Sequence, residues 1–560
     1  MNYKKLRFNS YKLLGSDLTD YQIQILNYFN KSSNTVLLLY LTVGCGKTLT
    51  SLACGISALE QNKIDEIVIL SPKSVQDEFD QNFKLLQTFR NINKIYRNKI
   101  KLVAYNGNNS QKSFEKIIDI SKKYLFIIDE LHLFMRGVIK VNLEQDQKIR
   151  NVGNCQSIFN IIKSLKFKKV IGLTGTPSAK FPFEMIPFFN LNTSKSKPLF
   201  PENIDDFENY YICKSSHRLK HVAELKKNLK GLIAYKELKT DLKVSPLQEI
   251  EVEMSENMYK KYLMDYYLEL QETTFIKHRN IYGIGYGMTS TFHAKTFQDS
   301  IYYNDDIMNK KEINDNLNLA LRGTLEKFKY NSLIKKIKVD NEHCPKLLKM
   351  YKDTIKIKGL CVFYFKFVDY GVNIMEEILK KYGYEKFKGD ENKQQQNEHN
   401  DLKPTFITFT GNETSEQKAR IKKIFNSYEN RHGEIIKYMI LSSCGAVGIT
   451  LKNVRYLGIG CVEFNYSAIR QIMGRVNRFN SHKDLEPKER TLEQKIYLSV
   501  KNEKYYKSNI NEINKLCSRT TYKYENKKAL CIERIIYQDS IFDDKINEEF
   551  RDVLKSVSVI

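Results

Sequence analysis

The chain has 560 residues and a formal net charge of +25, with 90 Lys and Arg against 65 Asp and Glu. Hydrophobic residues make up 42%, which is enough to form buried cores and excludes global disorder. The apolar runs are far shorter than the ~20 residues of a membrane-spanning helix, so we expect no membrane partner.

The positive charge is typical of proteins that bind a polyanion, because Lys and Arg neutralise phosphates and release counterions. The richness in Lys, Asn, Ile and Tyr, with no Trp, is also the pattern of AT-rich coding sequence. Charge alone leaves both interpretations open. The ten cysteines include no C-x-x-C pair, and no apolar stretch follows the basic N-terminal residues. We therefore expect a reducing, cytoplasmic environment.

Short continuous apolar runs alternate with helical patterns, which predicts parallel strands covered on both faces. The expected strands are residues 35–41, 67–71, 100–104, 124–128, 168–173, 359–365, 405–409, 437–442, 456–462 and 495–500. Longer helical patterns fill much of the middle and the end of the chain. The predicted fold is α/β, with parallel-sheet domains at 1–185 and 346–502, a mostly helical insertion at 186–345 and a helical C-terminal extension at 503–560.

The first expected strand leads directly into a glycine-containing loop and a helix. The loop consists of Gly44, Cys45, Gly46, Lys47 and Thr48. Glycines let backbone N–H groups curl around phosphate oxygens, and the helix N-terminus adds partial positive charge. Lys47 is expected to reach the β- and γ-phosphates, and the Thr48 hydroxyl to hold Mg²⁺. The alternative is a glycine-rich turn without a ligand.

Two further expected strands end in polar residues. The strand at 124–128 delivers Asp129 and Glu130 to its carboxyl end, where α/β sheets bind ligands. One carboxylate can bind Mg²⁺ and a second can deprotonate an attacking water, while His132 could couple this site to the second domain. The strand at 168–173 ends in Thr174-Gly-Thr176-Pro, which fits a segment that senses the γ-phosphate or a simple turn.

In the second half, a strand precedes the glycine-containing loop at 445–451, and a helix is expected around 467–482. Arg475 and Arg478 lie three residues apart, so a helix would place both on one face. Guanidinium groups on one face suit a phosphoryl group presented across a cleft. The alternative is a basic helix that faces RNA or the solvent-exposed surface.

Together these segments resemble motifs I, II, III, V and VI of superfamily 2 helicases. The matching residues are GCGKT at 44–48, DELH at 129–132, TGTP at 174–177, GAVGITL at 445–451 and QIMGRVNR at 471–478. Upstream, Leu18 to Gln22 resembles the L-x-x-Y-Q element of the Swi/Snf-like branch, and Ser71-Pro-Lys73 resembles motif Ia. LLLYLTVGCGKTLT at 37–50, LTGTP at 173–177 and GRVNRFNSH at 474–482 resemble the family of poxvirus nucleoside triphosphatase I and the early transcription factor small subunit, with relatives on yeast cytoplasmic linear plasmids.

The resemblance implies two RecA-like lobes that bind ATP and Mg²⁺. It implies that Gln22 recognises adenine, Lys47 and Thr48 hold phosphates and Mg²⁺, Asp129 holds Mg²⁺ through water, Glu130 is the general base, and Arg475 and Arg478 are arginine fingers, with Gln471 in the same motif. Coupling or nucleic-acid roles are implied for His132, Thr174, Thr176, Ser71, Lys73, Gly445, Gly448 and Thr450.

Three functions remain open from the sequence. The first is a DNA-stimulated ATPase or translocase that acts in transcription of a cytoplasmic viral or plasmid genome, with an RNA polymerase as a candidate partner. The second is a duplex-unwinding helicase of replication or RNA metabolism. The third is a non-catalytic assembly factor, which intact Lys47, Glu130, Arg475 and Arg478 argue against. The expected nucleic-acid partner is DNA or RNA, bound through its phosphate backbone.

Overall fold

The computed structural model divides the chain into two units. Unit 1 is formed by Met1–Lys239 and Asp543–Ile560, and unit 2 by Thr240–Phe542. The structure describes residues 18–42, 44–73, 96, 98–143, 153–178, 180–192, 197–213, 216–238, 241–272, 279–280, 283–284, 294–306, 308–326, 333–387, 404–443, 449–518 and 531–560. All statements below concern these residues.

Unit 1 is built on a parallel sheet. Its strands lie in the order β3-β2-β4-β5-β1-β8, and every described pair is parallel. The strands are β1 (Val36–Leu41), β2 (Glu66–Ser71), β3 (Ile100–Ala104), β4 (Tyr124–Ile128), β5 (Lys168–Thr174) and β8 (Ile233–Lys236). The strands predicted in the first third of the sequence are therefore confirmed. Parallel sheets are covered on both faces, which explains their continuous apolar runs.

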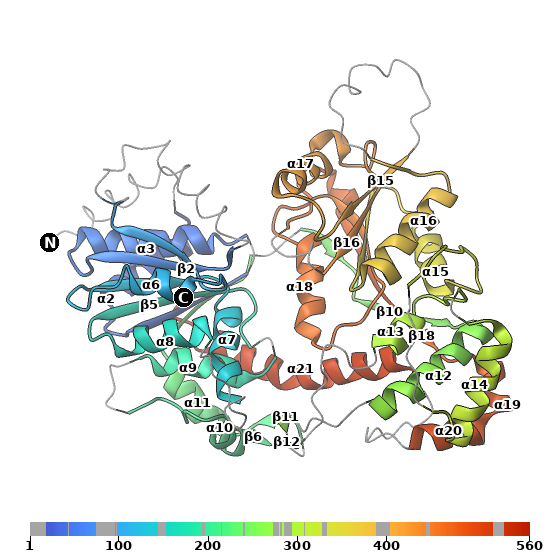
Figure 1. The fold of residues 1–560 in the computed structure, drawn as a ribbon. Helices are drawn as coiled ribbons and strands as arrows, with labels where there is room; N and C mark the ends of the chain where they lie inside the picture. Colours follow the sequence, from blue (N-terminus) through green and yellow to red (C-terminus); the bar gives the residue numbers. More distant parts are fainter. Residues whose placement is uncertain are drawn as a thin grey trace. The chain divides into compact units, whose positions relative to one another are not determined.

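Helices cover both faces of this sheet, as Figure 1 shows. Alternate strand residues such as Leu37 and Leu39 join one core with α2 (Asp20–Lys31) and α3 (Lys47–Glu60). On the opposite face, a Cβ on Gly172 would lie 2.5 Å from Leu131 at the start of α7 (Leu131–Leu143). The missing side chain at this position lets α7 approach β5 closely.

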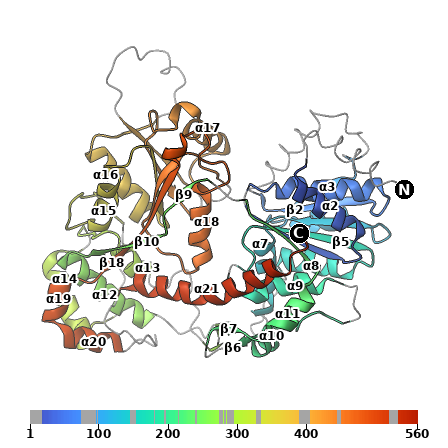
Figure 2. The same ribbon diagram turned by 180° about the vertical axis from the view of Figure 1, so that it is seen from behind.

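Unit 2 contains a second parallel sheet, in the order β10-β18-β17-β13-β16-β15-β14, with β9 also paired to β18. Its strands are β9 (Lys243–Val244), β10 (Gln248–Glu253), β13 (Leu360–Phe365), β14 (Glu385–Lys386), β15 (Thr405–Phe409), β16 (Tyr438–Ser442), β17 (Val454–Ile459) and β18 (Thr491–Val500). The strands predicted in the second half are confirmed. Figure 1 and Figure 2 both show α15 (Pro345–Thr354) and α16 (Asn373–Lys381) on one side of this sheet and α18 (Tyr466–Val476) on the other.

The boundaries expected at residues 185 and 345 do not coincide with the limits of the two units. β8 pairs with β1 and belongs to the first sheet, while β10 pairs with β18 and belongs to the second. The segment 186–345 is therefore divided between the units rather than forming an insertion of its own. It contains helices, including α12 (Glu256–Glu272) and α14 (Lys310–Arg322), but also short strands. Two strand edges recruit these strands, because an open sheet edge exposes unpaired backbone groups.

The C-terminal extension is helical, as predicted, but it does not form one body. It contains α19 (Glu503–Ser508), α20 (Ile510–Ser518) and the long α21 (Ile532–Ser556). Residues up to Phe542 belong to unit 2, and those from Asp543 on belong to unit 1. None of the helices that the structure describes combines the length and apolar character needed to cross a membrane.

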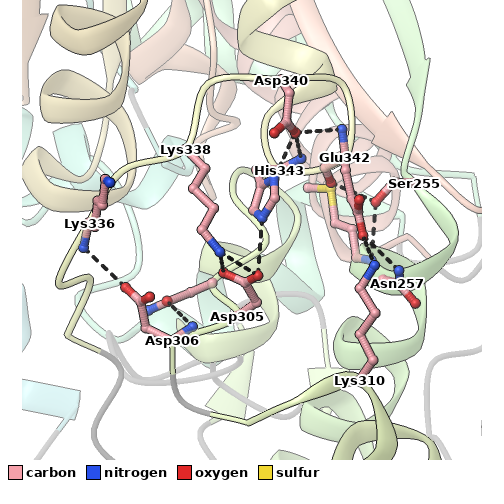
Figure 3. A network of polar contacts seen from close by, with 12 residues as sticks. Ser255, Asn257, Asp305, Asp306, Lys310, Lys336, Lys338, Asp340, Glu342 and His343 are labelled. Carbon is pink, nitrogen blue, oxygen red and sulfur yellow. Dashed lines mark hydrogen bonds and ion pairs between the residues drawn. The ribbon is translucent and has the colours of Figure 1, made fainter.

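A polar network ties together the loops of the helical part of unit 2 (Figure 3). Lys338 Nζ lies 2.7 Å from an Asp305 carboxylate oxygen, and His343 Nδ1 lies 2.6 Å from Asp340 Oδ1. Glu342 pairs with Lys310 at 2.8 Å, and this hydrogen bond is the main reason that the pKa of Glu342 is lowered. The network joins the start of α14 to the segment that precedes α15, which indicates a structural role.

A fully buried ion pair joins α15 to the first turn of α21 within unit 2. Lys346 Nζ lies 2.6 Å from Glu533 Oε1, and both side chains are 0% exposed. Burial raises the pKa of Glu533, although Lys346 opposes this effect. Glu533 Oε2 also accepts a 2.7 Å hydrogen bond from the Ser499 amide of β18. The pair therefore fixes α21 against both a helix and the sheet.

Removing one partner of this pair should be strongly destabilising. We expect Lys346→Ala to lower the free energy of unfolding by about 3–5 kcal/mol, because an uncompensated carboxylate is left buried. Lys349 in the same helix is the matched control. It pairs with Asp353 while 47% exposed, so Lys349→Ala should cost no more than about 1 kcal/mol. Urea unfolding of both variants measures the difference, and equal losses would contradict the assignment.

Candidate functional site

The glycine-containing loop of unit 1 connects β1 to α3 as the sequence predicted. Gly44 and Gly46 have φ angles of +95° and +67°, which side chains with a Cβ rarely adopt. Gly46 is the N-cap of α3 and provides no side-chain cap. Lys47 begins the helix, and its Nζ donates a 3.1 Å hydrogen bond to the Leu41 carbonyl across the loop. The loop therefore combines left-handed glycines with a helix N-terminus and a lysine, the features that a phosphate-binding loop requires.

Residues of α2 lie directly against this loop. The Tyr21 hydroxyl donates to the Cys45 carbonyl at 2.8 Å, and Gln22 Nε2 lies 3.5 Å from the same oxygen. A Cβ on Gly46 would lie 2.7 Å from Gln22 Nε2, so only glycine permits this approach. The structure thus brings Gln22 to the loop, while its role toward adenine stays a prediction, and adds Tyr21, which the sequence analysis did not single out.

The acidic pair follows β4. The Asp129 side chain is buried, whereas that of Glu130 is 36% exposed. Glu130 has a φ of +46°, a left-handed conformation that is strained for a residue with a Cβ. The Tyr105 hydroxyl donates to the Asp129 carbonyl at 3.3 Å. The pKa of Tyr105 is raised, mainly by burial and secondly by the negative charge of Glu130. A protonated tyrosine therefore supports this turn. The sequence analysis missed Tyr105, although its position directly after β3 was a signal that could have found it.

The end of β5 is joined to the acidic turn by one buried contact. His132 Nδ1 lies 3.0 Å from Thr174 Oγ1 and 3.5 Å from Glu130 Oε2. Thr174 Oγ1 also accepts a 3.0 Å hydrogen bond from the Thr176 amide. The coupling role of His132 toward the second domain stays a prediction; within unit 1, this residue links Glu130 to the TGTP turn.

His132 should make stability depend on pH. Burial lowers the pKa of His132 below 6.5, although Glu130 raises it, and the surrounding charges are Glu130, Arg136, Glu184 and Lys47. Because the pKa of His132 is lower in the folded state, the unfolded state binds the proton more tightly. The contribution of neutral His132 to stability is therefore present above the unfolded-state pKa and is lost as pH falls. For one proton, the free energy of unfolding should fall by at most about 1.4 kcal/mol per pH unit below about pH 6.5.

Unfolding of the parent protein and of His132→Asn at roughly pH 7.5 and pH 5.5 measures this effect. The variant should lose less stability on acidification than the parent does. Other buried histidines, such as His482, are common to both proteins and cancel in the comparison. Identical pH dependence in the two proteins would contradict the prediction.

Sheet order brings these three segments to one edge. β5 lies between β4 and β1, so the carboxyl ends of three neighbouring parallel strands carry Thr174, Asp129 and the loop that contains Lys47. No group of three or more His, Cys, Asp and Glu among the described residues could hold a metal ion by itself. Thr48 and Asp129 instead provide the few oxygen donors that suit Mg²⁺ bound mainly through phosphates and water. The residues present thus fit ATP with Mg²⁺.

The motif Ia residues follow β2. The Ser71 side chain is fully buried, whereas Lys73 is exposed and its amide donates to Asn106 Oδ1 at 2.9 Å. An exposed lysine is accessible to a phosphate backbone. A buried Ser71 hydroxyl is not, so any contact of this segment with nucleic acid involves Lys73 or the backbone.

In unit 2, the helix α18 carries Gln471 and Arg475 but ends at Val476. Arg478 lies beyond the helix, so the expectation that both arginines share one helical face is wrong. The chain turns at Asn477, and Arg478 Nε donates to the Gly474 carbonyl at 3.2 Å. Arg478 Nη1 also hydrogen-bonds Thr450 Oγ1, which brings motifs V and VI together.

Two residues of motif V cannot be placed. Gly445 and Gly448 lie outside the described residues. Thr450 is held from its other side by Asn426, whose Nδ2 donates to the Thr450 carbonyl at 2.8 Å and whose Oδ1 accepts from the Lys452 amide at 2.8 Å. Asn426 was missed because a single asparagine after a helix carries no motif signal.

Family models match both halves of the chain. Residues 16–179 match the family described as the res subunit of type III restriction enzymes, and residues 345–480 match the helicase conserved C-terminal domain. The chain is a superfamily 2 helicase-like ATPase. The matched segments contain the loops of both sheets that carry the helicase motifs. The two parallel-sheet units correspond to the RecA-like lobes of an ATP-hydrolysing enzyme.

Viral proteins are similar along most of the chain. A "Termination factor NPH-I homolog" of African swine fever virus is 26% identical over 576 residues, which cover 93% of this chain and 76% of the relative. "Nucleoside triphosphatase I" of Heliothis armigera entomopoxvirus is 26% identical over 521 residues, with 87% and 74% covered. Among solved structures, the Sulfolobus solfataricus SWI2/SNF2 ATPase core in complex with dsDNA is 14% identical, covers 97% of each chain and has a TM-score of 0.34.

Proposed function

We propose that this superfamily 2 ATPase is stimulated by DNA, translocates along it and acts in transcription of a cytoplasmic viral or plasmid genome. The observation that carries the ATPase part is the buried His132–Thr174 contact, at 3.0 Å, which links the acidic turn to the TGTP turn beside the phosphate loop. The similarity to a protein named as a termination factor supports the transcription part.

In this proposal, five residues of unit 1 hold and activate ATP. Gln22 recognises the adenine, and Lys47 binds the β- and γ-phosphates. Thr48 and Asp129 hold Mg²⁺, which neutralises phosphate charge, and Glu130 accepts the proton of the attacking water. The 36% exposure of Glu130, against the buried Asp129, supports this division of roles, because only the base must reach water.

Residues of unit 2 complete the reaction. Arg475 and Arg478 act as arginine fingers that stabilise charge developing on the γ-phosphoryl group, and Gln471 contributes from the same motif. His132, Thr174 and Thr176 relay the state of the nucleotide. Partial exposure of both arginines supports a role that needs contact with a ligand.

DNA is bound through its phosphate backbone without regard to sequence. Lys73 and Thr450, with Ser71 in the segment that positions Lys73, contribute contacts, as do Gly445 and Gly448 through their backbone. The net charge of +25 supports counterion release as a driving force. Affinity should therefore fall steeply as salt concentration rises.

One experiment separates this proposal from a duplex-unwinding helicase. ATP hydrolysis is measured with single-stranded DNA, duplex DNA and RNA of equal length, beside strand displacement on a long duplex. We expect DNA to stimulate turnover without efficient strand separation. Stimulation by RNA alone, or robust unwinding, would favour a helicase of replication or RNA metabolism. Absence of turnover under every condition would favour a non-catalytic assembly factor.

We further propose that the helices of 186–345 and 503–560 outside the two sheets contact an RNA polymerase, since functions are added outside a shared catalytic fold. Lys226 and Lys227 are exposed on α11 (Val222–Leu229). Replacing both with Glu should weaken capture of the polymerase of the native genetic element and spare ATP hydrolysis. The matched control replaces the exposed Lys112 and Lys116, outside both segments. Equal capture by both variants would contradict the proposal.

A further inference from the structure

The TGTP turn continues into a loop that α7 holds from one side. Thr174 contacts His132 of α7, as described above. In the short 3-10 helix Pro182–Met185 that follows the loop, Glu184 is fully buried, and its Oε1 accepts a 2.8 Å hydrogen bond from Arg136 Nε of α7. Glu184 Oε2 accepts from the Lys180 amide at 3.0 Å. The loop from Thr174 to Glu184 is therefore anchored to α7 at both of its ends.

The C-terminal part of α21 holds the middle of the same loop. Asn547 Oδ1 accepts a 2.5 Å hydrogen bond from Ser178 Oγ, and Asn547 Nδ2 donates to the Lys180 carbonyl at 2.9 Å. Arg551 Nη1 donates to the Ser178 carbonyl at 3.1 Å. Asp544 orients Arg551 through two hydrogen bonds of 3.0 and 3.1 Å. Residues 544, 547 and 551 share one face of the helix, as their spacing requires.

These contacts act on a strained backbone. Ser178 has a φ of +57°, and its side chain is fully buried. A left-handed conformation of a residue with a Cβ persists only when its surroundings enforce it. The Ser178 hydroxyl and carbonyl are both bonded to α21, so Asn547 and Arg551 are the groups that enforce it. Both are themselves buried, at 1% and 6% exposure.

We propose that Asn547 and Arg551 are positioning residues of the ATPase. By holding Ser178, these two residues fix the path of the loop that begins at Thr174. They thereby fix the positions of the Thr174 hydroxyl and the Thr176 amide relative to His132 and Glu130. This role rests on the proposed function of the TGTP turn. It assigns to a helix near residue 550, outside the family-matched segments 16–179 and 345–480, a part in the chemistry of unit 1.

Other contacts anchor the same end of the chain without touching the loop. Glu549 Oε2 accepts from the Leu219 amide at 2.9 Å. Beyond the helix, Ser558 Oγ accepts from the Tyr235 amide at 2.9 Å, and the Val559 amide donates to the Ile233 carbonyl at 2.9 Å. Glu549→Gln is therefore a matched control: it weakens the packing of the C-terminal part of α21 within unit 1 and leaves the Ser178 contacts in place.

The test compares Asn547→Ala, Arg551→Ala, Arg551→Lys and Glu549→Gln in the full chain. We expect the two alanine variants to lose about 10- to 100-fold in kcat, since small misplacements of a catalytic group have effects of this size. KM for ATP should change by no more than about twofold, because the phosphate loop is untouched. Arg551→Lys should recover part of kcat, since lysine can still donate to the Ser178 carbonyl. Glu549→Gln should keep the parental kcat.

A second readout does not depend on turnover. Hydrogen exchange at the Thr176 amide should be faster in the Asn547→Ala variant than in the parent or in the Glu549→Gln variant. The melting temperature of each protein shows how much of the change comes from general destabilisation. Unchanged exchange in Asn547→Ala, or an equal loss of kcat in Glu549→Gln, would overturn the positioning role. A parent protein without turnover would instead contradict the proposed function, and the exchange result would still decide whether α21 holds the loop.

Discussion

We expect the Glu130→Gln variant to bind ATP but to hydrolyse it about 10²- to 10⁴-fold more slowly than the parent. A general base usually contributes a factor of this size. Gln has the same size as Glu and can still hydrogen-bond, but it cannot accept the water proton. The φ of +46° at this position is a backbone property that both side chains tolerate equally, so the turn should be preserved. Single-turnover hydrolysis beside ATP binding by calorimetry measures the two effects separately.

Lys47→Ala is the contrasting variant. It removes the charge at the start of α3 that would face the phosphates, so binding of ATP itself should weaken. In the structure, Lys47 Nζ donates a 3.1 Å hydrogen bond to the Leu41 carbonyl across the loop, which places the ammonium group on the side of the loop where the phosphates would bind. A Glu130→Gln protein that turns over at the parental rate would show that another group is the base.

Loss of the arginines in motif VI should reduce turnover far more than affinity. Arginine fingers meet charge that develops in the transition state, and their removal costs on the order of 10³–10⁵ in rate. We expect losses toward this range for Arg475→Ala and Arg478→Ala at saturating ATP and DNA. Lys488→Ala is the control, since Lys488 is an exposed basic residue of the same unit.

Arg478 needs a further comparison, because it also bonds Thr450 and the Gly474 carbonyl. Its removal could disturb motif V as well as the chemistry. Thr450→Val removes the same hydroxyl contact and keeps the guanidinium group. If Arg478 is a finger, Thr450→Val should retain much more activity than Arg478→Ala. Normal turnover at saturating DNA, with a raised DNA requirement, would instead assign both arginines to nucleic-acid binding.

The sequence by itself predicted the strands and the edge at which the site lies. Runs such as Val36–Leu41 and Tyr124–Ile128 are apolar throughout because parallel strands are buried on both faces. The loop or turn after such a strand lies at the carboxyl edge of the sheet. The sequence therefore placed Lys47, Asp129 and Thr174 at one edge, and sheet order β4-β5-β1 makes their strands neighbours.

Local features that depend on a single residue were less predictable. The sequence of α18 continues with helix-compatible residues, yet the helix ends at Val476 and Arg478 turns back to Gly474. Likewise β8 is a short run that needs the open edge of β1 to become a strand. Distant contacts contribute in both cases, since Arg478 also bonds Thr450 and β8 pairs with β1, and local propensity is weaker than tertiary packing.

The contacts of α21 were decided by the tertiary structure alone. Asn547 and Ser178 are 369 positions apart, and Lys346 and Glu533 are 187 apart. α21 is an amphipathic helix. A single polar side chain that bonds a distant group does not change the periodic pattern of such a helix, so the sequence gives no sign of the contact. The sequence by itself predicted which segments carry the chemistry of ATP hydrolysis. Only folding decided which distant side chains hold those segments in place, because specific hydrogen bonds between remote residues depend on geometry that composition and spacing do not contain.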